Sequence, residues 1–184
     1  MKRTVVIMLL FLCTVIYQMY SQDTGSEDGS APIPKGFRSI QLGMTLEEVK
    51  QALLEEPYFN YRGDPDVSLL AEPNKTVIET DGAVYIERGF FQFHENSLYI
   101  INLFLSRDEI DHYSMFTTLK EKYGNPLSLS PEAVIWEDEI VRLSLERPLT
   151  VKYIEKEVFQ ALLEKSKIRK SHITLSREEF LDQF

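Results

Sequence analysis

The sequence has 184 residues, of which 43% are hydrophobic and 11% aromatic, so it carries enough apolar material for a hydrophobic core. This composition excludes global disorder and fits one domain with an appendage. The formal net charge of −9 makes the chain acidic. Because an acidic surface repels nucleic acid and anionic lipid, we expect neither as the main partner.

The N-terminus has the pattern of a secretory signal. Lys2 and Arg3 precede an uncharged, largely apolar run over residues 4–17, and polar residues return from Gln18. This run is slightly shorter than the about 20 apolar residues that a spanning helix needs. We therefore expect a cleaved signal peptide over 1–21. A retained N-terminal anchor is the alternative, because Met19 stands where a cleavage site favours a small residue.

The predicted location of the protein is the periplasm or the extracellular medium, with membrane contact only through the N-terminal segment. Cys13, the only cysteine, lies inside the apolar run without the small residues that precede the cysteine of a lipoprotein signal. Cleavage after residue 21 would leave a mature protein with neither disulfide nor thiol chemistry. Residues 22–36 are rich in Gly, Ser, Pro and acidic residues, which predicts a flexible linker before a domain over 37–184.

The domain is predicted to open with a short strand over 37–42. A helix follows, because Thr45 and Glu48 have the spacing of a capping box and Pro57 marks a stop. In the long connection over 57–75, the dipeptide Asp64-Pro65 matches a helix start and predicts a short helix over 67–70.

Three β-branched and aromatic runs come next and predict an antiparallel meander. They cover 76–80, 83–93 and 98–105. The dipeptide Asp81-Gly82 predicts a tight hairpin between the first two. Glu95-Asn96 marks the next turn.

A second helix and a second meander are predicted in the same order. The helix covers 111–123 and ends at Gly124, and its apolar face is predicted to hold Tyr113, Phe116, Leu119 and Tyr123. The strands cover 133–136, 141–145 and 149–153, and the last two alternate between apolar and polar residues, which is typical of one buried and one wet face.

We therefore predict an α+β fold with two helix-plus-meander pseudo-repeats, 37–106 and 111–154, which form one antiparallel sheet with the helices on one face. The tail over 155–184 is predicted to be helical in two pieces. One covers 155–169, and a short last helix begins at a capping box of Ser176 and Glu179.

The segment Leu42-Gly43-Met44-Thr45-Leu46-Glu47-Glu48-Val49 resembles the opening of SmpA/BamE-type envelope domains, and the helix end Lys122-Tyr123-Gly124-Asn125-Pro126 is similar to theirs. The doubled plan resembles the architecture of β-lactamase-inhibitor protein, and the chain resembles exported proteins of spirochaetes. The resemblance covers about 37–154 and implies a non-enzymatic module that binds protein. The doubling, the helical tail and the missing lipobox depart from the single-copy family and weigh against its outer-membrane assembly role.

The connection over 57–75 is the first candidate binding segment, because long loops in compact domains are often functional. It holds Tyr58, Phe59, Tyr61 and Arg62, and Tyr and Arg are enriched at interface hot spots. Tyr58 and Phe59 could equally fold back over the sheet. Trp136, the only tryptophan, is expected in the core, with a partner-facing anchor as the alternative.

No sequence motif for catalysis, metal binding or a cofactor is present, so we expect no cofactor and no metal. The function predicted is an exported envelope module that binds a protein partner without catalysis. A small-ligand or lipid carrier is one alternative and would need an apolar cavity between sheet and helices. A hydrolase with carboxylates around Glu137 and Asp138 is the other.

Overall fold

The computed structural model describes residues 30–69 and 75–181. The predicted signal peptide over 1–21 and the linker as far as residue 29 lie outside the described residues. Residues 31–36, which the sequence assigns to the linker, belong to the folded domain. The backbone N–H of Ala31 donates to the carbonyl of Lys122 at 2.8 Å, and Ile33 packs against the core.

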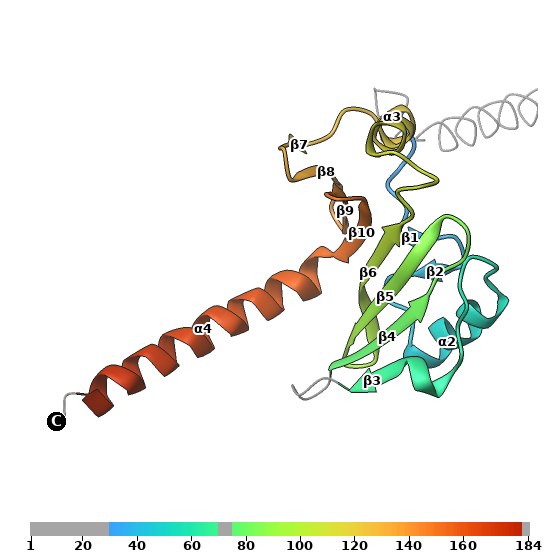
Figure 1. Cartoon of the computed structure of the whole chain (residues 1–184). Helices are drawn as coiled ribbons and strands as arrows, with labels where there is room; N and C mark the ends of the chain where they lie inside the picture. Colours follow the sequence, from blue (N-terminus) through green and yellow to red (C-terminus); the bar gives the residue numbers. More distant parts are fainter. Residues whose placement is uncertain (1–29, 70–74, 182–184) are drawn as a thin grey trace, which may run out of the picture. The chain divides into compact units, whose positions relative to one another are not determined.

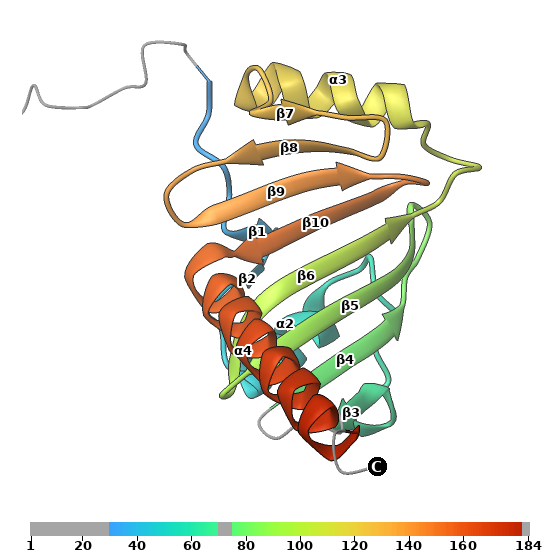
Figure 2. The same cartoon turned by 90° about the vertical axis from the view of Figure 1, so that its left-hand side faces the viewer.

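An antiparallel sheet of eight strands forms the centre of the described chain, in the order β3-β4-β5-β6-β10-β9-β8-β7 (Figure 1, Figure 2). With the helices, this confirms the α+β class. The pair β6–β10 joins strands β3–β6 to strands β7–β10. The strands are β3 (Val67–Leu69), β4 (Lys75–Asp81), β5 (Ile86–His94), β6 (Ser97–Leu105), β7 (Ser128–Leu129), β8 (Ala133–Glu137), β9 (Val141–Glu146) and β10 (Thr150–Glu155).

Alternation along the strands divides the sheet into two faces. On the inner face, the apolar side chains of β4, β5, β6, β8, β9 and β10 are buried against the helices. The helices α2 (Leu46–Glu55) and α3 (His112–Tyr123) contribute Val49, Leu53 and Leu119 to this core cluster. The opposite face is called the open face below.

The predicted starts of the helices α2 and α3 are confirmed. Thr45 and Glu48 form the capping box of α2, and the Asp111 side chain accepts a hydrogen bond from the backbone of Ser114 at the start of α3. One residue on the predicted apolar face of α3 is misplaced, because Tyr113 is 72% exposed. Met115 packs against the core with Phe116 and Tyr123 instead.

The turns between β4 and β6 match the prediction only in part. Glu95 and Asn96 both have positive φ and form the tight turn between β5 and β6. The predicted tight hairpin at Asp81-Gly82 is wrong, because four residues, 82–85, separate the two strands. Gly82 bridges to Phe59, and a Cβ there would lie 2.2 Å from the carbonyl oxygen of Ile86, so close backbone approach explains this glycine.

Two predicted elements near the N-terminus differ in form. The strand expected over 37–42 is a small hairpin of β1 (Gly36–Phe37) and β2 (Ile40–Gln41), which Arg38 turns with a φ of 54°. The helix expected over 67–70 is wrong: a 3-10 turn, η1 (Asp64–Asp66), precedes strand β3. Strand β3 pairs with β4, and this pairing outweighs the local helix signal.

The predicted division of the tail is also wrong, because α4 (Lys156–Leu181) runs without a break through residues 170–176. Its first turns lie on the open face, where Val158, Phe159 and Leu162 pack against Tyr99, Ile100 and Ile154. Figure 2 shows α4 in front of the sheet and α2 behind it. Among the described residues, no helix has the length and apolar character needed to span a membrane.

Candidate functional site

The aromatic residues of the 57–75 connection lie mostly in the core. Phe59 is buried and meets Phe37 and Phe91 edge to face, with ring centroids 6.2 and 5.5 Å apart. A Cβ on Gly89 would come within 2.8 Å of the Phe59 ring, so the ring uses space that only glycine leaves. Tyr58 is half-buried against Phe37, at 6.1 Å. Folding back over the sheet thus describes Tyr58 and Phe59 better than presentation to a partner.

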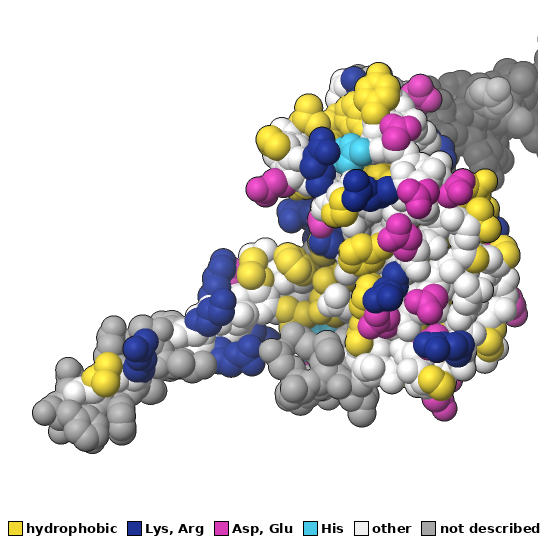
Figure 3. Space-filling view, in the orientation of Figure 1, with side chains coloured by type: hydrophobic (Ala, Val, Ile, Leu, Met, Phe, Trp, Pro, Cys, Tyr) yellow, Lys and Arg dark blue, Asp and Glu magenta, His cyan; other side chains and the backbone are white. Residues whose placement is uncertain are grey.

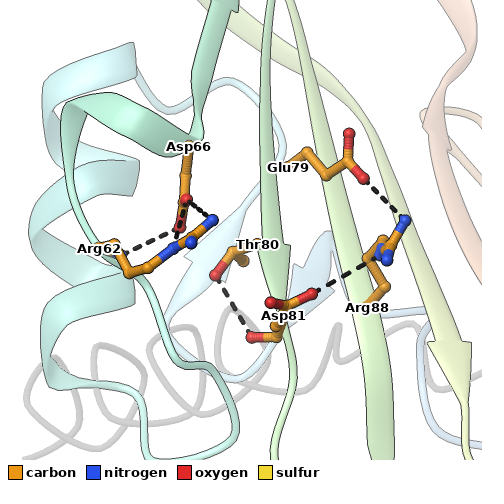
Figure 4. A network of polar contacts seen from close by, with 6 residues as sticks. All are labelled: Arg62, Asp66, Glu79, Thr80, Asp81 and Arg88. Carbon is orange, nitrogen blue, oxygen red and sulfur yellow. Dashed lines mark hydrogen bonds and ion pairs between the residues drawn. The ribbon is translucent and has the colours of Figure 1, made fainter.

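Arg62 is held by a buried carboxylate, while its own side chain stays 67% exposed. The Asp66 side chain is 0% exposed, and its Oδ1 accepts from Arg62 Nε at 2.9 Å and Nη2 at 2.7 Å, while its Oδ2 accepts from the Arg62 backbone at 3.0 Å. This pair closes the turn that leads into β3 (Figure 4). The hydroxyl of nearby Tyr61 is buried without a hydrogen-bond partner, and burial raises its pKa.

A second ion-pair group lies next to the first. Arg88 on β5 reaches Glu79 at 2.9 Å and Asp81 at 3.8 Å on β4 (Figure 4). Together with Arg62 and Asp66 they line a shallow cavity of about 290 Å³. Three carboxylates face two guanidinium groups here, so the cavity has no unpaired positive charge with which to attract an anion.

Trp136 occupies the core. The side chain is 2% exposed, its Nε1 donates to the carbonyl of Gly124 at 3.0 Å, and its ring lies 6.3 Å from that of Phe116. Strand β8 is thereby fastened to the end of α3. The first of the two sequence interpretations, core packing, describes this residue.

The carboxylates of Glu137 and Asp138 bind side-chain and backbone groups near the ends of strands β8 and β9. Glu137 pairs with Lys156 through Oε1 and with Arg142 through Oε2, each at 2.7 Å. The hydrogen bond from Lys156, and then that from Arg142, hold the pKa of Glu137 below its usual range. Asp138 Oδ1 accepts from the backbones of Ile140 and Val141. A general acid needs a raised pKa, so this arrangement gives the hydrolase alternative no support.

The open face brings together residues that sequence reasoning missed. The register aligns Glu79, Phe90, Asn102, Lys152 and Ser144 in one row across the sheet, and Asp81, Arg88, Phe104, Thr150 and Glu146 in the next. Phe90 and Phe104 meet edge to face at 5.5 Å, and Phe104 is 37% exposed. The sequence held one signal for this face: Phe90 and Phe104 stand at positions where the period-two pattern of a half-buried strand requires polar residues.

Charges on the open face are paired within the face itself. Lys152 reaches Glu146 at 2.7 Å, and Glu146 also accepts from the hydroxyl of Ser144 at 2.9 Å. Between the phenylalanines and this group, the Oδ1 of Asn102 is buried without a donor. Figure 3 shows acidic and basic side chains interspersed on one side of the molecule. The face therefore combines exposed aromatic area with balanced charge.

No group of three or more His, Cys, Asp or Glu side chains is placed to hold a metal ion within the described part of the chain. His94 Nδ1 is buried without a partner and lies beside the Tyr99 ring, at 6.4 Å. His112 lies at the start of α3, where burial lowers its pKa. Neither histidine stands in an arrangement that performs proton transfer.

Removing the partner of the buried Asp66 carboxylate should destabilise the fold. We expect Arg62→Ala to lower the midpoint of urea unfolding, because the buried Asp66 carboxylate loses two of its hydrogen bonds. Urea unfolding of the full chain measures the change. Arg107→Ala, at an exposed arginine, is the control and should have no measurable effect; an equal effect of the two substitutions would contradict the structural role of Arg62.

The Glu137 pairs should make stability depend on pH. Because the folded-state pKa is lowered, the contribution of Glu137 is complete above the unfolded pKa of about 4.3 and is lost as the pH falls through the folded pKa. Glu137→Gln should therefore lower the free energy of unfolding at pH 7 by about 1–3 kcal/mol and have a much smaller effect at pH 3. Glu139→Gln, on the same turn and exposed, is the control. A difference in unfolding free energy between the wild type and Glu137→Gln that stays the same at both pH values would contradict this role of Glu137.

Comparison with known proteins places the chain in a family. No curated protein matches it, and no solved structure matches it. A family model, the TP0088 domain, matches residues 35–165, which include every strand of the eight-stranded sheet, α2, α3 and the first turns of α4. The match supports a bacterial-type domain and gives no support to the SmpA/BamE resemblance. The chain belongs to the TP0088 domain family.

Proposed function

We propose that this protein is an exported module that docks a folded protein partner on its open face. The observation that carries the proposal is the Phe90–Phe104 pair, which lies uncovered among paired charges on the central strands. Of the described helices, only α4 packs on this face, and those of its apolar side chains that the structure describes contact Tyr99, Ile100 and Ile154 there. The aromatic pair lies one and two rows away from these contacts.

The chemistry of the face favours a protein over other partners. Interfaces combine aromatic anchors with a polar rim, and their energy comes from a few central residues. Here Phe104 would be the anchor, while Arg88, Lys152 and Glu146 would form the rim. Balanced charge gives a nucleic acid or an anionic membrane no attractive potential. A partner that presents an apolar side chain amid charges of both signs fits best.

Export is the second part of the proposal. It rests on the basic start, the apolar run and the polar exit of residues 1–21. The polar composition that follows would hold the domain away from the membrane if the N-terminus is retained. The partner would accordingly be a protein of the cell envelope.

The open face also fits an origin by duplication. We propose that helix-plus-meander units formed the sheet by pairing their last strands, β6 and β10. Two observations support the idea. In the sheet order, the strand numbers rise from each edge toward the central pair β6–β10, and this pair is antiparallel. A two-fold relation normal to the sheet keeps both helices on the same face, which leaves the other face available to a partner.

Site-specific photocrosslinking in the cells that make the protein tests the docking proposal. A crosslinking amino acid in place of Phe104 should give one discrete adduct, recovered with the envelope fraction. The same amino acid in place of Tyr113, exposed on α3, is the matched control and should not give it. Lys152→Glu reverses a charge of the rim and leaves two carboxylates side by side, so it should reduce the adduct at least tenfold by disturbing charge complementarity with the partner.

Two results would contradict the proposal. Equal crosslinking at positions 104 and 113, or an adduct indifferent to Lys152→Glu, would exclude a specific interface on the open face. Recovery of the full chain in the cytosol, with residues 1–21 intact, would exclude export.

A further inference from the structure

A groove of about 520 Å³ lies on the inner face, between α3 and the β1–β2 hairpin, with β6 and β10 as its floor. This volume is within the range of small-molecule sites. Its walls are mainly apolar, and the side chains that form the floor and sides are Leu103, Leu105, Val151, Phe37, Met115 and Leu119. The groove lies on the other side of the sheet from the open face, so it is independent of the docking proposal.

A phenol at one end of the groove has a hydroxyl without a hydrogen-bond partner in the described chain. Tyr153 on β10 lines the groove and is only 6% exposed, and its hydroxyl makes no hydrogen bond within the described part of the chain. Burial of the ring raises the pKa of Tyr153, so the hydroxyl stays protonated and able to donate. Since no acceptor of the described chain uses this hydroxyl, it is available to a ligand in the groove.

A second phenol and a cation stand at the same end. Tyr123 lines the groove close to Tyr153 and makes no side-chain hydrogen bond in the described structure. Lys122, next to it in the last turn of α3, also lines the groove and forms no ion pair among the described residues. Two hydroxyl donors and an ammonium therefore gather at one end. Met115, which belongs to the apolar wall, lies eight residues before Tyr123 on α3, about 12 Å away along the helix.

We propose that the groove binds a medium-chain carboxylic acid, with its acyl chain on the floor of β6 and β10 and its carboxylate at Tyr153, Tyr123 and Lys122. The two phenols donate to the carboxylate oxygens, and Lys122 supplies the opposite charge. The apolar walls exclude water from the acyl chain, which provides most of the affinity. Arg38 also lines the groove, but it is paired with Glu56 at 2.8 Å and is not counted as a ligand.

Isothermal titration calorimetry of the full chain with decanoate tests this site. We expect saturable binding of one decanoate per chain. Tyr153→Phe removes only the hydroxyl and should weaken binding about tenfold, since a hydrogen bond to a charged group is lost. Lys122→Gln should weaken binding several-fold and reduce its salt dependence. Decanol, which lacks the charge, should bind more weakly than decanoate and respond little to Lys122→Gln.

A blocking variant and a control separate the groove from other apolar segments. Thr118→Trp, at an exposed position on the groove wall, should abolish binding, whereas Thr117→Trp is the neighbouring control, because Thr117 does not line the groove. Residues 1–29 are the same in every variant, so any binding there cancels in the comparison. Thermal unfolding confirms that each variant is folded. Decanoate binding that is absent, or that is unchanged in Tyr153→Phe and Thr118→Trp, would overturn the proposal.

Discussion

The antiparallel pairing of β6 with β10 is the interaction on which the rest of this structure depends. It runs from Phe104 opposite Thr150 to Ile100 opposite Ile154, and it alone connects the two sets of strands in the described sheet. Because side chains alternate along each strand, these two strands also build both proposed sites. Leu103, Val151 and Tyr153 form the floor of the inner groove, and Phe104 and Lys152 face the opposite side.

Both sites contain side-chain groups that the described chain leaves without a partner or without cover. The Tyr153 hydroxyl lines the groove, Asn102 Oδ1 is buried without a donor, and Phe104 keeps apolar area in water. Neighbouring positions such as Leu143 and Trp136 are buried and satisfied. Departures from local consistency are expected where a protein binds something. These three residues all lie on β6 or β10, and both proposals rest on them.

Local signals in the sequence predicted the elements whose causes are local. The capping box at Thr45 and the helix end at Gly124 appear in the structure, whereas the alternation predicted in β9 holds only in part, because Ser144 is buried. The capping pattern at Ser176 failed because the same residues also fit the interior of a continuous helix. The candidate site was harder to predict. Phe59 is buried by contacts with distant Phe37 and Phe91, and the open face exists only once the register between strands is fixed.

Hydrogen exchange of the full chain, followed amide by amide, tests the central role of the β6–β10 pair most directly. If this pair holds the sheet together, the amides of Leu103, Val151 and Tyr153 should exchange only through global unfolding, with the same opening free energy as those of Phe91 and Leu143 in the flanking strands. An opening free energy for the three that is lower than for the flanking amides would show that the halves separate while each stays folded, and would contradict the account.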